Sequence, residues 1–155
     1  MNEEAYALWE AKSNLMVSIP NEPLLIGKPS MEGGFEKRVA LIYSYNTDEE
    51  KTQCLNILKR IVAAGKWTDK DVYYLGFESS QATTLLALLE SFNPAWIVSF
   101  GITPAQLKWW IEVRFNIVLP YQKTNCLFTQ HPIPLDAQKE LKLAFWEAWK
   151  KITQP

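Results

Sequence analysis

The sequence has few of the residues that build metal and redox sites. Its 155 residues include one histidine and two cysteines. An ordinary Cys/His zinc site needs more ligands than these, so we expect no bound metal. Cys54 and Cys126 are far apart in the sequence, the first in a helical pattern and the second in a strand-like one. Two reduced thiols in the core are favoured, and a disulfide is the alternative.

An excess of one charge and long apolar runs are also lacking. Lys and Arg number 16 and Asp and Glu 17, which leaves a net charge of −1. Bulk charge therefore does not indicate a strongly basic nucleic-acid-binding protein, although a local basic patch is possible. The N-terminus, Met1-Asn2-Glu3-Glu4, is unlike a signal peptide. No apolar run approaches the roughly 20 residues that span a membrane. We expect a cytoplasmic protein without a membrane partner.

The glycine-rich loops of nucleotide-binding proteins are missing as well. The sequence contains neither a P-loop nor a dinucleotide-binding fingerprint. It also lacks the Gly-x-Ser-x-Gly nucleophile elbow. The loop after the first expected strand, residues 44–48, has no glycine, and backbone amides do not easily wrap a phosphate without one. No cofactor is implied.

What the chain does have is the length and composition of one globular domain, 1–155, with 48% hydrophobic residues. Residues 1–37 are expected to form an N-terminal helix at 3–14 and a proline-rich arm. Three prolines within ten residues keep that arm extended. Residues 38–153 are expected to form an α/β core, with a loop at 30–37 leading into it.

Strand and helix patterns alternate through this core. Short apolar runs are typical of strands buried on both faces, and they occur at 39–43, 72–75, 96–100 and 125–129. Helices are expected at about 48–64, from Ser79 or Ser80 to Asn93, from Thr103-Pro104 onward, and from Asp136 to about Ile152. The alternation predicts a three-layer α/β/α sandwich with a central four-stranded parallel sheet. We expect the strand order 2-1-3-4.

Ligands of such sheets bind at the carboxyl ends of the strands. Three loops are expected there, at 44–48, 101–104 and 130–136. The first two supply the candidate binding residues Tyr45, Asn46, Gly101 and Thr103.

The third loop contains the single histidine, in His131-Pro132-Ile133-Pro134. The prolines make this a stiff loop, which either faces a ligand or partner or is a surface turn that aims the last helix. A nucleophilic cysteine would require Cys54 or Cys126 to meet His131, and this arrangement is not favoured.

The run His131-Pro132-Ile133-Pro134-Leu135-Asp136 resembles the His-Pro-Ser-Pro-Leu-Ser motif of uracil-DNA glycosylases, and it also follows the last strand. Residues 96–108 resemble that family's apolar strand, its turn, and a helix with Ala-Gln-Lys. Together these matches cover about the last third of the chain. The resemblance implies a uracil-DNA glycosylase-like fold. In it, His131 would stabilise charge on the uracil oxygen, and Leu135 would wedge into the duplex as the base flips out.

Other parts of the glycosylase site are not matched. The family's Gly-Gln-Asp-Pro-Tyr-His motif should follow the first strand, where this chain has 43–48, with Asp48 near the position of the water-orienting acid. The base-reading Asn is replaced by Leu75-Gly76-Phe77. An enzyme without these groups has lost most of its transition-state binding. If the chain is a divergent glycosylase, His131 and Asp48 are its candidate catalytic residues.

A second resemblance covers most of the chain as a pattern. The chain is similar to the psi subunit of the bacterial DNA polymerase III clamp loader in its arm, its degenerate first loop, a Phe100-Gly101 turn and a final helix with Phe145-Trp146. This resemblance implies a non-catalytic protein of glycosylase-like fold whose partners are clamp-loader or other replication proteins, with DNA contact possible.

Seven tryptophans stand out in the composition. Trp109 and Trp110 are neighbours on an expected helix, so their side chains point about 100° apart and cannot both face the core. We expect at least one of Trp109 and Trp146 to be exposed. Such a side chain either covers the edge of the core, anchors a protein interface or stacks on a nucleic-acid base. Trp109 and Trp146 are therefore the candidate interface residues.

Overall fold

The computed structural model describes residues 29–154 except 82. The expected helix at 3–14 and nearly all of the arm lie outside the described residues. The described helices are α1 (Asp48–Ala64), α2 (Leu85–Phe92), α3 (Pro132–Ala137) and α4 (Lys139–Thr153). None of them is long and apolar enough to cross a membrane.

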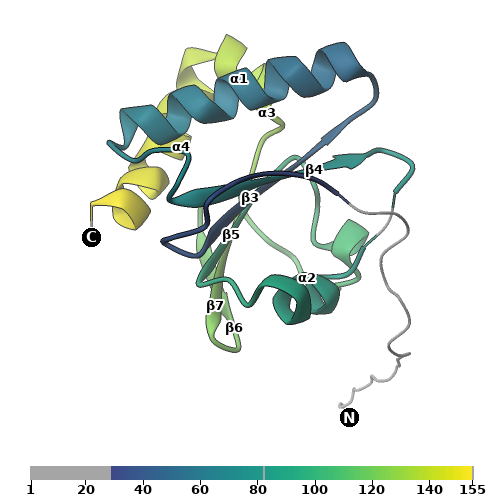
Figure 1. The fold of residues 1–155 in the computed structure, drawn as a ribbon. Coiled ribbons are helices and arrows are strands. Elements are labelled where there is room, and N and C mark those ends of the chain that lie inside the picture. Colours follow the sequence, from purple (N-terminus) through teal and green to yellow (C-terminus); the bar gives the residue numbers. More distant parts are fainter. Residues whose placement is uncertain (1–28, 82, 155) are drawn as a thin grey trace.

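A six-stranded mixed sheet forms the centre of the protein (Figure 1). Its order is β2-β4-β3-β5-β7-β6. The four inner strands are parallel, and their order confirms the predicted 2-1-3-4. The parallel strands are β3 (Val39–Tyr45), β4 (Val72–Glu78), β5 (Trp96–Phe100) and β7 (Thr124–Thr129).

The sequence-based prediction of four strands was wrong at both edges. β2 (Ser30–Gly33) pairs antiparallel with β4, in a segment that was expected to be a loop. β6 (Val118–Tyr121) pairs antiparallel with β7. Both are short, and β6 contains Pro120, which lacks the N–H that a central strand needs. Edge strands of this kind have no strong pattern in the sequence because only one side of each is paired.

Helices α1 and α2 begin at threonine N-caps. The Thr47 side chain accepts a hydrogen bond from the Glu50 N–H, and α1 then runs to Ala64 as expected. The second helix was expected to open at Ser79 or Ser80, but it begins after Thr84, whose hydroxyl accepts from the Ala87 N–H.

The C-terminal region forms two helices where one was expected. His131 is the N-cap of α3, so the presumed stiff loop is the first turn of a helix with proline at its start. Gln138, in extended conformation, separates α3 from α4. Asp136 therefore lies inside α3 and does not cap the last helix.

The helix expected from Thr103-Pro104 does not form. A single 3-10 turn, Ala105–Leu107, ends where Lys108 takes a left-handed φ of 62°. Beyond it, the Trp109 ring packs at 5.1 Å from the Tyr121 ring and 6.2 Å from the Phe128 ring, between ring centroids. The packing of the half-buried Trp109 against the sheet overrides the local helical pattern.

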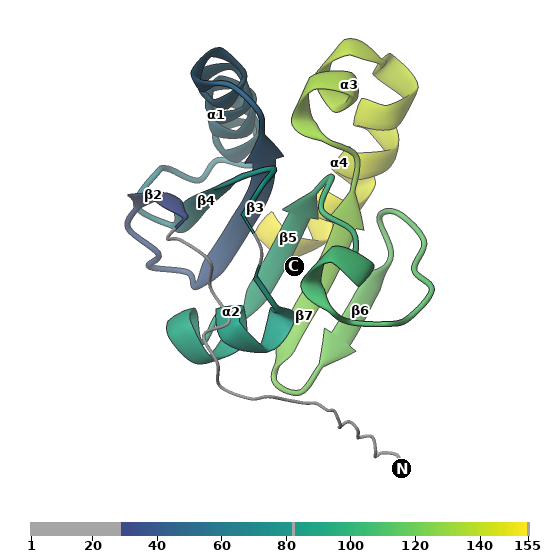
Figure 2. The same ribbon diagram turned by 90° about the vertical axis from the view of Figure 1, so that its right-hand side faces the viewer.

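Helices cover both faces of the sheet (Figures 1 and 2). On one face, α1, α3 and α4 enclose a core that includes Cys54 and Trp149. On the other, α2 and the 3-10 turn enclose a second core that includes Cys126. The two free thiols are buried on opposite faces of the sheet, so the sheet itself prevents a disulfide between them.

Candidate functional site

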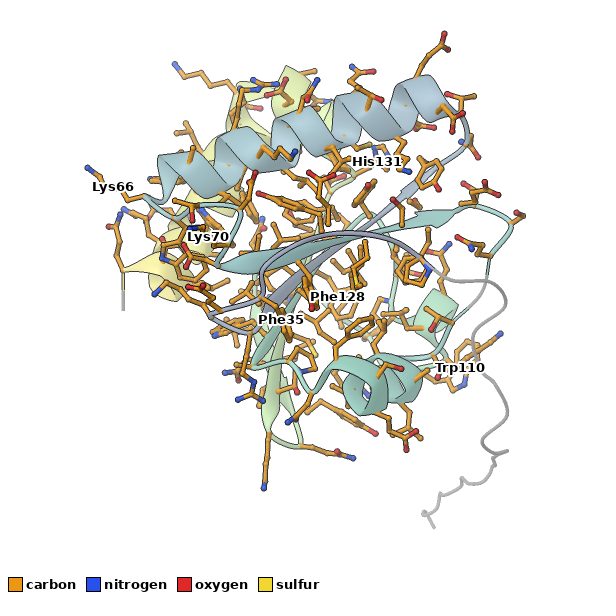
Figure 3. The ribbon with its side chains drawn as sticks, viewed as in Figure 1. Phe35, Lys66, Lys70, Trp110, Phe128 and His131 are labelled. Atoms are coloured by element: carbon orange, nitrogen blue, oxygen red, sulfur yellow. The ribbon has the colours of Figure 1, made fainter. Side chains whose placement is uncertain are left out.

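The three expected loops do meet at the carboxyl edge of the parallel strands. The Gly101 N–H donates to the Thr129 carbonyl at 3.0 Å, which joins the ends of β5 and β7. His131 Nε2 lies 2.9 Å from the Ser44 carbonyl oxygen, which joins the end of β7 to the end of β3. The histidine therefore occupies the centre of this edge, beneath α1 (Figure 3).

Gly101 is required for this approach. Its φ is +91°, a backbone conformation that residues other than glycine rarely adopt. A Cβ at this position would lie 2.9 Å from His131 Cβ and 3.0 Å from His131 Cα. The turn after β5 thus packs its backbone directly against the histidine.

Both ring nitrogens of His131 are used inside the protein. Nδ1 accepts a hydrogen bond from the Ile133 N–H at 3.3 Å, which caps α3. An accepting Nδ1 carries no proton, so in the neutral ring the proton is on Nε2, where it is donated to the Ser44 carbonyl. The ring therefore ties the start of α3 to the end of β3.

The carboxylate beside His131 belongs to Glu50 and not to Asp48. Glu50 Oε2 lies 3.6 Å from His131 Nε2. Its other oxygen, Oε1, accepts from the Asn46 N–H at 2.6 Å, while the Glu50 N–H donates to the Thr47 hydroxyl. This is a variant of the capping box in which the carboxylate binds the residue before the N-cap. Asp48 is exposed in the first turn of α1. The Thr-x-x-Glu spacing of the capping box was the sequence signal that could have identified Glu50.

Cys54 also reaches the histidine, but it is not set up as a nucleophile. Its Sγ lies 3.8 Å from His131 Nε2. Burial, with a further contribution from Glu50, raises the pKa of the Cys54 thiol to about 12. Because Nε2 already donates to Ser44, it has no lone pair with which to take the thiol proton.

The side chains around His131 are mainly structural. Leu135 is 1% exposed and belongs to the core beneath α1, so the expectation that it projects into a duplex is not met. Pro132 is also buried, and Pro134 is half-buried. These residues hold α3 against α1 and present no wedge at the surface.

The candidate residues of the first two loops differ in burial. Tyr45 is buried, with the Lys51 ammonium 5.6 Å from its ring centroid. Burial raises the pKa of the Tyr45 phenol, and the carboxylates of Glu78 and Asp48 raise it further. Asn46 is exposed. Thr103 is also exposed, and its hydroxyl and N–H close a turn with Gln106.

Among the tryptophans that the structure describes, the exposed one is Trp110. The prediction that at least one of Trp109 and Trp146 is exposed was wrong, because both are half-buried. Trp109 packs on the sheet, whereas Trp110 is 72% exposed and points away from the protein (Figure 3). Phe115 and Ile117, which follow Trp110 closely in the sequence, are 50% and 53% exposed. We call residues 108–117 the aromatic segment. Trp146, the other candidate, is half-buried between α1 and α4.

Within residues 29–154, no three His, Cys, Asp or Glu side chains lie close enough to hold a metal ion. The His131, Glu50 and Cys54 side chains meet, but the one imidazole is committed to Ser44 and Ile133. No protein-family model matches this chain, and no curated protein is significantly similar to it.

Proposed function

We propose that this chain is a non-catalytic protein that acts by binding another protein through its aromatic segment, residues 108–117. The observation that carries the proposal is the exposure of Trp110, Ile111, Phe115 and Ile117 within ten residues of chain. Large apolar side chains grouped at a surface mark interaction sites, and tryptophan is enriched among the residues that dominate binding energy.

Both ends of the aromatic segment contact strands of the sheet. Trp109 packs edge-on against Tyr121, and the Asn116 N–H donates to the Phe128 carbonyl at 2.8 Å. These contacts fix both ends of the exposed stretch to β6 and β7. A preorganised surface of this kind loses less conformational entropy on binding than a free peptide does.

The contacts of His131 support a role without catalysis. Both of its ring nitrogens are used by Ser44 and Ile133, and Leu135 is buried in the core. A substrate would have to displace at least one of these hydrogen bonds to reach the ring. The histidine is better suited to holding the sheet edge together.

We further propose that the fold is uracil-DNA glycosylase-like and that the partner is a clamp-loader or other replication protein, as the similarity to psi implies. The parallel order β4-β3-β5-β7 supports the fold proposal. DNA is a possible additional partner of the same segment, since Lys108 lies 6.0 Å from the Trp110 ring centroid and Arg114 is nearby in sequence.

Affinity purification from the native cell with full-length baits tests the main proposal. Wild-type chain should retain clamp-loader or single-strand-binding proteins, and Trp110→Ala should lose them. Leu86→Ala is the matched control, because Leu86 is 48% exposed on α2. Equal recovery of these partners by Trp110→Ala and wild type would refute the assignment of the segment.

A second candidate function is removal of a base from DNA. It is favoured only by the 3.6 Å approach of Glu50 to His131 at the carboxyl edge of the sheet. Purified chain incubated with uracil-containing oligonucleotides should then release the base, and His131→Ala and Glu50→Gln should both abolish the release. If the His131→Ala variant releases the base as well as wild type does, this site is excluded.

A further inference from the structure

A groove lies on the face of the protein opposite to α2, between α1 and the α3–α4 pair. It encloses about 280 Å³. Apolar side chains form most of its surface, and charged ones stand among them. The lining residues are Ile57, Arg60, Ile61, Ala64, Leu135, Asp136, Lys139, Lys142, Leu143, Phe145 and Trp146.

Two helical stripes form the walls of the groove. On α1 the lining residues fall at 57, 60, 61 and 64, and on α4 at 139, 142, 143 and 146. Both sets have the i, i+3, i+4, i+7 spacing of one helix face. Each stripe is about 10 Å long at a rise of 1.5 Å per residue. The groove thus offers two matched helix faces about two turns in length.

Fixed contacts hold α1 and α4 in position on either side of the groove. The Trp149 indole N–H donates to the Ile61 carbonyl at 3.1 Å, which joins α4 to α1 beside the groove. Leu135 and Phe145, both buried, support its floor from α3 and α4. At the mouth, Leu143 is 56% exposed and Trp146 is half-buried. An apolar side chain entering here would meet a preformed apolar surface.

The charge around the groove is positive. Asp136 accepts from Arg60 at 3.2 Å and faces Lys142 at 3.5 Å, so one carboxylate is shared by two cations. Lys139 has no ion pair among the described residues. Three cations against one carboxylate leave a net charge of +2 on the lining, in a chain whose overall charge is −1.

We propose that this groove binds an acidic amphipathic helix of a partner protein. Apolar side chains on one face of that helix would enter between α1 and α4, and carboxylates on its flanks would face Arg60, Lys139 and Lys142. Laying an amphipathic helix into an apolar groove is a recurrent mode of peptide recognition, and complementary charge gives it orientation and specificity. The groove lies across the sheet from the aromatic segment, so the two sites can be tested separately.

The test uses full-length protein and a fluorescein-labelled synthetic helix with Leu and Phe on one face and Glu on both flanks. Fluorescence anisotropy should show binding that weakens as salt rises from about 0.1 M to about 0.5 M, because the rim charges are exposed. Lys142→Glu and Leu143→Asp should each lower the affinity about tenfold or more. Lys151→Glu and Leu86→Asp, at exposed positions outside the groove, are the matched controls and should bind as wild type does.

Several results would overturn the proposal. Equal binding of a matched peptide with Lys in place of Glu would remove the role of charge, and unchanged binding by Lys142→Glu would place the peptide elsewhere. No binding by wild type, with binding gained in Trp9→Ala, would assign the groove to this chain's own acidic segment at 3–10. Self-association that Leu143→Asp abolishes would assign it to a second copy. Binding to phosphatidylserine vesicles without binding to the peptide would assign it to a lipid surface.

Discussion

Replacing Gly101 with alanine should destabilise the protein and disturb His131 together. The φ of +91° is unfavourable for any residue with a Cβ, at a cost of about 1–2 kcal/mol. The new Cβ would also lie 2.9 Å from His131 Cβ, and forced overpacking of this kind costs about 1–3 kcal/mol more. We therefore expect Gly101→Ala to lower the free energy of unfolding by about 2–5 kcal/mol.

Urea denaturation followed by tryptophan fluorescence measures this loss, and a double-mutant cycle separates its two causes. His131→Gly removes the Cβ that alanine would strike but leaves the φ unchanged. In that background the Gly101→Ala penalty should shrink by about 1 kcal/mol or more. A loss below about 1 kcal/mol for Gly101→Ala, or a penalty that does not depend on residue 131, would refute the argument that this turn packs against the histidine.

Four further predictions concern the histidine, the two thiols and the N-cap of α1. His131 is the only histidine, so the NMR signals of its imidazole nitrogens can be assigned without ambiguity. We expect the neutral ring to carry its proton on Nε2. A proton on Nδ1 would contradict the hydrogen bonds to Ser44 and Ile133. Burial raises the pKa of both Cys54 and Cys126 from 9.0 to about 12, so both thiols should resist alkylation in the native state at pH 8 and react on unfolding. The same shifts imply that unfolded thiols ionise first, so stability should fall as pH rises from 9 to about 12; a stability that is flat over this range would oppose the assignment. Thr47→Ala should lower the free energy of unfolding by about 1 kcal/mol through loss of the α1 cap, measured by urea denaturation.

The strands that the sequence predicted correctly are those buried on both faces. Their continuous apolar runs, such as Val39–Tyr43, do not match the spacing of an amphipathic helix. The alternation of these strands with helices constrains their order in the sheet. The edge strands β2 and β6 escaped prediction because pairing on one side leaves little constraint on their side chains. α1 was placed correctly because its cap, Thr47, and its acidic first turn are both local signals.

The candidate site was predicted in outline and corrected in detail. The meeting of the loops at 44–48, 101–104 and 130–136 follows from parallel strand order, and His131 does lie among them. The identity of its carboxylate neighbour did not follow, because Glu50 and Asp48 differ by half a helical turn and only the rotation of α1 decides between them. The exposure of Trp110 instead of Trp109 was likewise decided by the packing of one ring on the sheet.

The parallel α/β core, the capped helix α1 and the lack of nucleotide-binding loops could all be inferred from the amino-acid sequence alone, because each depends on local patterns. Three other properties follow from tertiary packing: Leu135 is buried, His131 uses both ring nitrogens internally, and α1 and α4 form a cation-rimmed groove. Those properties depend on contacts between segments more than 70 residues apart, such as His131 with Cys54 and Arg60 with Asp136. Residue type and spacing do not encode such distances, whereas the packing of helices on a twisted sheet fixes them.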